Sequence, residues 1–298
     1  MCHPFACSVV AQRPGHVYNL RMAAKTPPTS PVEMIAALAA LGEMRVWSVL
    51  ITIFGDAVAA RGGQVSAMTL QTILDRLRFK PEAMRVAIHR LVKDGWISRD
   101  KQGRQSYYKL SKEGRAEFLP ATQRIYAEAP ALAGPWQLAI LPPMPEKQRG
   151  EAKKRYSDAG YLAVSPTCFI APAGTPAPKD DQALNLDAPL AQVPNWVRET
   201  LGPPHLQIEY QQLERMLERL SRTKVTQGDE AAALRVIMIH QWRRVLLRHA
   251  DLPAELLPAT WRGEACRALV LQEHKRLSAL ADPWLDNEIG SGTAALAC

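Results

Sequence analysis

The chain has 298 residues, 47% of them hydrophobic, and a formal net charge of +8. This length and apolar content exclude a disordered chain and allow two or three globular domains. Five scattered cysteines without a Cys-x-x-Cys pair argue against a disulfide framework and a zinc knuckle, so we expect a cytoplasmic protein. No segment approaches the roughly 20 apolar residues of a membrane-spanning helix.

Residues 1–40 are predicted to be a disordered lead-in, because they contain the Pro- and Ser-rich stretch KTPPTSP. No charged region precedes the short apolar patch of this segment, so we expect no signal peptide. The segment also carries cysteines and histidines, but their spacing matches no common zinc pattern and predicts no metal site. These residues are Cys2, His3, Cys7 and His16.

Residues 41–120 begin with three predicted helices and a short strand. The first helix starts near Arg45 and ends at the RGG of residues 61–63, and QVSAM follows as a small strand. A second helix ends before Pro81, which opens the third at a position where its missing N–H has no cost. The predicted inward side of the third helix is formed by Met84, Ile88, Leu91 and Val92.

After Gly95 the apolar period changes from that of a helix to that of a strand. WISRD and QSYYKL are predicted strands joined by a tight turn in which Gly103 takes positive φ. Of the adjacent Tyr107 and Tyr108, one is expected to face the core, and Ser111 is expected to cap the next helix. Helix, strand, helix, helix and ribbon is the order of a winged helix, whose recognition helix enters the DNA major groove while its hairpin grips the backbone.

The positive charge of the chain is concentrated in this region. Residues 61–115 contain thirteen Lys and Arg and five Asp and Glu. The difference, +8, equals the net charge of the whole chain. Such a concentration is typical of a phosphate-binding surface, the alternative being a solvated basic face without a partner. We predict that DNA is contacted by Arg78, Lys80, Arg85, His89, Arg90, Lys93, Lys101, Gln102 and Arg104.

Residues 121–210 are predicted to form a linker helix and a small α+β sandwich. PWQLAIL and CFIAP are typical of buried strands, and a polar helix ending at Gly160 lies between them. A short strand near residues 188–193 and another at LQIEY, residues 206–210, complete this unit.

Residues 211–298 are predicted to be helical, with apolar stripes that form a core or a dimer seam. The segment IHQWRRVLLRH places a histidine and three arginines within about two turns, and guanidinium groups suit phosphates. A tryptophan near them is expected to cover an aromatic or adenine ring; the alternative is a set of ordinary salt-bridge arginines. The predicted effector residues are Trp136, His240, Trp242, Arg243, Arg244 and Arg248.

The sequence contains none of four common enzyme motifs. The sequence contains no G-x-S-x-G, P-loop, G-x-G-x-x-G or H-E-x-x-H pattern. We therefore predict no catalytic residue and no cofactor.

Several segments, in order, resemble the PaaX-type transcriptional regulators, the repressors of bacterial phenylacetate degradation. They are FGD, RGG, RVAIHRLVKDGW, GRQSYYKLS, YQQL and HQWRRVLLRHADLPAELLPATW. The resemblance implies an α+β protein with an N-terminal winged helix, a central ferredoxin-like (Cas2-like) sandwich and a C-terminal all-α domain. It also implies a homodimer on an inverted repeat of DNA, released by an aryl-acyl-CoA effector such as phenylacetyl-CoA.

A Cas2-like middle domain raises the alternative of a metal-dependent nuclease. However, the strand PWQLAIL lacks the acidic residue that a magnesium site needs near its end.

Overall fold

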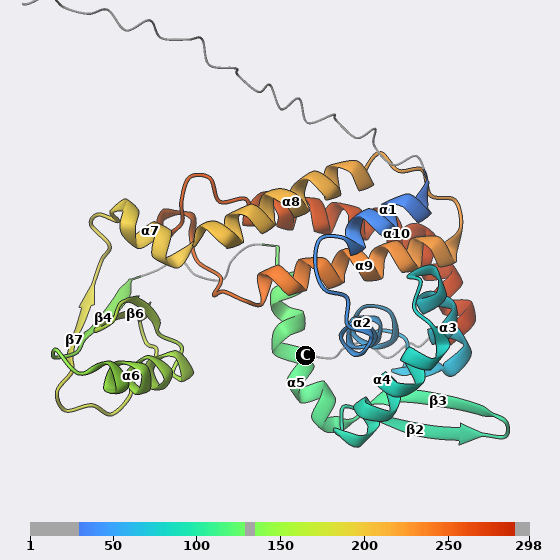
Figure 1. Cartoon of the computed structure of the whole chain (residues 1–298), viewed down its shortest axis with the longest axis horizontal. Coiled ribbons are helices and arrows are strands. Elements are labelled where there is room, and N and C mark those ends of the chain that lie inside the picture. Colours follow the sequence, from blue (N-terminus) through green and yellow to red (C-terminus); the bar gives the residue numbers. More distant parts are fainter. Residues whose placement is uncertain (1–29, 129–134, 290–298) are drawn as a thin grey trace, which may run out of the picture.

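The computed structural model describes residues 30–128 and 135–289, and it confirms a fold of mixed helix and antiparallel sheet. A body of long helices forms the centre of the molecule (Figure 1). A hairpin projects from one end of this body, and a four-stranded sheet lies at the opposite end. None of the described helices is both long and apolar enough to cross a bilayer.

The first helix, α1 (Pro31–Ala39), lies where the sequence predicted a disordered lead-in, so that prediction is wrong for these residues. Ser30 and Glu33 form a reciprocal capping box, and the proline occupies the first turn, which makes the Pro/Ser stretch a helix start. Met34, Ile35 and Leu38 are buried in the main core. The predicted disorder before residue 30, and Cys2, His3, Cys7 and His16, lie outside the described residues.

The next elements follow the predicted order. Helix α2 (Val46–Ile53) continues into a π-helical turn, η1 (Phe54–Val58), and Gly62 and Gly63 then take positive φ and end it. Strand β1 (Gln64–Ser66), helix α3 (Ala67–Arg76) and helix α4 (Pro81–Lys93) come after it.

The hairpin and its cap are also confirmed. Strands β2 (Ile97–Gln102) and β3 (Gln105–Leu110) pair antiparallel, and β1 adds to β3 in the order β1-β3-β2. Gly103 has φ +60° in the two-residue turn. Tyr108 is the buried tyrosine, and Ser111 caps α5 (Lys112–Tyr126) by accepting a hydrogen bond from the Gly114 N–H at 2.8 Å.

The middle of the chain forms a sheet in the order β5-β6-β4-β7, with helix α6 against one face. No helix lies between β6 and β7. The predicted strand LQIEY is wrong: it belongs to α8, because its apolar residues continue the helical spacing of the buried Leu213 and Leu217. The elements are β4 (Trp136–Ile140), α6 (Glu146–Asp158), β5 (Leu162–Ser165), β6 (Cys168–Pro172), β7 (Leu184–Ala188) and α7 (Asn195–Leu201).

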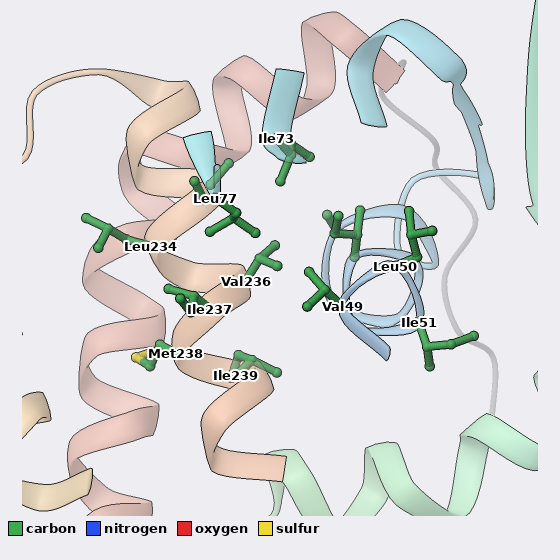
Figure 2. Packing of buried hydrophobic residues seen from close by; sticks show 14 of the residues in the cluster. Val49, Leu50, Ile51, Ile73, Leu77, Leu234, Val236, Ile237, Met238 and Ile239 are labelled. Atoms are coloured by element: carbon green, nitrogen blue, oxygen red, sulfur yellow. The ribbon is translucent and has the colours of Figure 1, made fainter. Parts of the chain in front are cut away.

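The C-terminal segment is helical, as predicted. It consists of α8 (Pro204–Leu220), α9 (Gly228–Leu246), the short 3-10 turn η2 (Ala254–Leu256) and α10 (Gly263–Ile289). Helix α9 is the centre of the main core, and Figure 2 shows its Val236 and Ile239 on the side of α2, whereas Leu234 and Met238 point the other way. One continuous core therefore joins the N-terminal and C-terminal segments, which the sequence treated as separate domains.

A buried ionic network crosses this junction. The Asp56 carboxylate in η1 accepts hydrogen bonds from Arg235 at 2.7 Å, Tyr126 at 2.7 Å and His274 at 2.8 Å. Arg235 of α9 also pairs with Asp282 of α10 at 2.5 Å. The network connects η1, α5, α9 and α10, so the orientation of the N-terminal helices depends on the C-terminal bundle.

Candidate functional site

Helix α4 has one apolar face and one charged face. Met84, Ala87, Ile88 and Leu91 are buried, whereas Val92, predicted to face inward, is 37% exposed. Val92 departs from the prediction because it lies one position past Leu91, at the edge of the apolar stripe. The opposite face exposes the predicted DNA-contacting residues of this helix, namely Arg85, His89, Arg90 and Lys93.

A groove of about 700 Å³ runs between α3, α4 and the hairpin. Arg85 and His89 line it together with Met68, which is 66% exposed, and Arg99. Sequence reasoning singled out neither Met68 nor Arg99, because only the packing of α3 and β2 beside α4 gives them this position. The groove therefore combines cations with exposed apolar groups, the two kinds of side chain that contact guanine edges and thymine methyl groups.

The turn between α3 and α4 contains the single described non-glycine residue with positive φ, Arg78, at +62°. The N–H of Arg78 donates to Asp75 O, and the N–H of Phe79 donates to Leu74 O, both at 2.9 Å. This pair of bonds is a Schellman motif, whose left-handed position usually holds glycine. An arginine there strains the backbone but places a cation two positions before Lys80, the N-cap residue of α4.

The hairpin tip holds the remaining predicted contacts, and Lys101, Gln102 and Arg104 are all exposed beside Gly103. Within the described part of the chain, Arg90 is the one Lys or Arg of the predicted set in an ion pair, with Asp94 at 3.5 Å. The other Lys and Arg residues of the predicted set are therefore not neutralised by carboxylates of the described residues. The structure places all nine predicted residues on α4, the turn before it and the hairpin tip.

Four of the six predicted effector residues meet in a pocket of about 370 Å³ between α2 and the end of α9. They are His240, Arg243, Arg244 and Arg248, and the pocket is completed by Glu43, Arg45, Trp47, Ser48 and Leu247. No local sequence signal indicates the α2 residues, because Ser48 and Arg243 are separated by 195 positions.

Both tryptophans predicted to cover a ring in this site lie elsewhere. Trp242 is fully buried in the main core and donates its indole N–H to Ile125 O at 3.0 Å, so it is not available to a ligand. Trp136 is 5% exposed in β4 and lines a different pocket, beside Arg198. Neither tryptophan is in the arginine pocket: helical position alone does not show that Trp242 is on the buried face of α9, and Trp136 belongs to β4 in a separate sheet. Trp47 is the aromatic residue of the arginine pocket.

The three α9 arginines are held differently. Arg244 donates to Glu209 at 2.8 Å, Gln241 at 3.0 Å and Leu41 O at 3.1 Å, and Arg248 also pairs with Glu209. Among the described residues, Arg243 donates to two neutral groups, Ser48 O at 3.1 Å and the Thr52 hydroxyl at 2.9 Å.

His240 is uncharged at neutral pH. Burial, followed by the charges of Arg243 and Arg244, lowers the pKa of its imidazole to about 4. Its Nδ1 lies 3.3 Å from the hydroxyl of Thr52, which also contacts Arg243.

Two family models match the two segments of the chain that share the main core. The family model described as PaaX-like protein matches residues 45–114, and the model described as PaaX-like protein C-terminal domain matches residues 204–287. The chain is also 29% identical over 257 residues to the transcriptional repressor PaaX of Escherichia coli (strain K12). That alignment spans 78% of this chain and 81% of the relative.

A solved structure of an uncharacterised protein from Mycobacterium tuberculosis is similar with a TM-score of 0.47 and 19% identity. It covers 79% of this chain and 97% of that one, and its likeness is too low to support an argument about fold or function. The two family models together match more than half of the chain, including the charged α4 face and every lining residue of the arginine pocket except Glu43. The chain therefore belongs to the PaaX-type family of transcriptional regulators.

Proposed function

We propose that this protein is a ligand-responsive transcriptional repressor that binds operator DNA as a homodimer in the cytoplasm. The observation that carries the proposal is the exposed, largely unpaired set of cations on α4, on the turn before it and on the hairpin tip. The family is one of transcriptional regulators and not of enzymes, and the curated relative from Escherichia coli is named a transcriptional repressor.

The N-terminal elements would act as a winged helix. In this arrangement α4 lies in the major groove, where Arg85 and His89 reach base edges, and the hairpin tip places Lys101 and Arg104 against the phosphate backbone. The order helix, strand, helix, helix and hairpin, with β1 added to β3, supports this assignment. One good bidentate arginine–guanine contact discriminates by about 1–3 kcal/mol.

The middle unit would be a ferredoxin-like, Cas2-like sandwich with a structural or effector-sensing role. The strand order β5-β6-β4-β7 and the helix α6 between β4 and β5 support it, although the link from β6 to β7 holds no helix. The alternative of a metal-dependent nuclease gains no support from the family, whose curated member is named a repressor.

Homodimerisation and an aryl-acyl-CoA effector such as phenylacetyl-CoA complete the proposal. A two-fold dimer presents two copies of α4 to an inverted repeat, which gives a longer recognition sequence than one copy can read. An effector releases DNA only through a higher affinity for the DNA-free state. Calorimetry with phenylacetyl-CoA, combined with gel shifts at rising concentrations of this thioester, tests the effector. Binding without loss of the DNA complex would reject it as the inducer.

DNA recognition is tested by selecting duplexes from a random library with the full-length protein and then measuring variants on the selected sequence. Arg85→Ala should weaken binding by about 1–3 kcal/mol and relax selection at one or two positions. Arg104→Ala should weaken binding to all sequences alike and lower the salt slope by about one unit. Arg215→Ala, on the exposed side of α8, is the matched control. Equal affinities of the unaltered protein and the three variants would rule out α4 and the hairpin as the DNA surface.

A further inference from the structure

The pocket between α2 and α9 holds more positive charge than its carboxylates balance. It is lined by Arg45, Arg243, Arg244 and Arg248, which face two carboxylates. Glu43 pairs with Arg45 at 2.9 Å, and Glu209 is shared between Arg244 and Arg248. His240 adds no charge, so the four arginines exceed the two carboxylates by two positive charges.

Arg243 is the centre of this imbalance. It is the one pocket arginine without a carboxylate within ion-pair distance in the described part of the chain. Burial lowers the pKa of its guanidinium, and its hydrogen bonds to the described residues use a single nitrogen, Nη1. A partly buried arginine is stable mainly when an anion is near it, and guanidinium groups bind the oxygens of phosphate in pairs.

We propose that this pocket binds the phosphate group of a phosphorylated small molecule, with Arg243 as the main anchor, and that Trp47 transmits its occupancy to α4. A phosphate dianion matches the unbalanced charge. The volume of about 370 Å³ accommodates a phosphate and a small ring, but leaves the rest of a larger ligand outside. Arg45, which is 59% exposed at the rim, supplies a second guanidinium.

The link to DNA binding is short. Trp47 lines the pocket, and the Arg90 guanidinium of α4 lies 6.0 Å from the centre of the Trp47 ring. Arg90 is in turn paired with Asp94 at the C-cap of α4. A ligand that displaces Trp47 therefore displaces a side chain of the DNA-reading helix. This part of the inference rests on the proposed function of α4.

Isothermal calorimetry of the full-length protein with inorganic pyrophosphate tests the pocket without DNA. Arg243→Gln should weaken binding about tenfold or more, since a charged hydrogen-bond partner is lost. Arg45→Gln should weaken it several-fold and cannot disturb the core, because this side chain is exposed. Arg215→Gln, an exposed arginine of α8, should leave it unchanged. No binding by the unaltered protein, or equal binding by all variants, would overturn the proposal.

DNA affinity with and without saturating pyrophosphate tests the transmission. The unaltered protein should bind the selected duplex at least about fivefold more weakly with pyrophosphate. Trp47→Leu should bind pyrophosphate with nearly unchanged affinity but lose this effect; an effect retained in full would overturn the role of Trp47.

The pocket phosphate has an alternative source in the DNA backbone. If Arg243→Gln lowers the salt slope of DNA binding in the absence of pyrophosphate, the pocket holds a DNA phosphate and the small-molecule proposal fails. If the unaltered protein binds pyrophosphate but no duplex, the pocket stands and the proposed DNA-binding function fails.

Discussion

Replacing Asp56 by alanine removes the centre of the buried network that joins the N-terminal helices to the C-terminal bundle. The side chains of Asp56 and Arg235 are only 1% and 2% exposed, so water cannot replace the lost partner. Arg235 keeps Asp282, whereas Tyr126 and His274 lose their acceptor. Breaking a buried ion pair from one side costs about 3–5 kcal/mol, and we expect a loss of this size in the free energy of unfolding.

Urea unfolding at neutral pH, followed by circular dichroism and by tryptophan fluorescence, measures this loss. Asp94→Ala is the control, because its pair with Arg90 is exposed and should contribute less than about 1 kcal/mol. Both signals should shift together in Asp56→Ala, since one core joins the two segments. A loss no larger than that of the control would refute the reasoning.

The same carboxylate predicts an acid sensitivity. Burial raises the pKa of Asp56, but Arg235, His274 and Tyr126 outweigh burial and hold this pKa well below its usual range. The unfolded chain then takes up a proton at a higher pH than the native protein does. The stability from this group is therefore complete above about pH 4, the usual value for an unfolded aspartate, and is lost as the pH falls further. Asp56→Asn should show a weaker decline below that pH.

Three further predictions concern single positions. Arg78→Gly should raise the thermal midpoint of unfolding, because it relieves up to about 1 kcal/mol of left-handed backbone strain. It should also lower the salt slope of DNA binding by about one unit, because one cation is lost. An unchanged midpoint would contradict the strain. His240→Asn should reduce the loss of stability between about pH 6.5 and 4, because the native pKa of about 4 makes the unfolded state take up the proton first. The difference between the unaltered protein and the variant is up to about 3 kcal/mol. If the urea midpoint falls equally in the two proteins between these pH values, the reasoning is wrong. Gly114→Ala should destabilise the protein by about 1–3 kcal/mol in urea, because the added Cβ would lie 2.2 Å from Trp96 O, a backbone atom that no side-chain rotation can move; a neutral effect would show that the start of α5 can shift.

Elements whose signals are local were predictable from the sequence. Pro81 marks the start of α4, Gly103 marks the hairpin turn, and Ser111 caps α5, because each residue acts on backbone within a few positions. The alternating and helical periods likewise predicted the strands of the hairpin and the charged face of α4. The resemblance to the PaaX-type regulators, carried by short ordered motifs, also required no structure.

Features that depend on segments far apart in the chain became visible in the folded protein alone. Helix α1 is stable because Leu38 and its neighbours pack against a core formed by residues more than 160 positions later. The burial of Trp242 removed it from the arginine site, and the approach of α2 to α9 supplied Trp47 instead. A period of apolar residues shows that a helix has a buried side, but which polar residues then face one another is set by packing between distant elements.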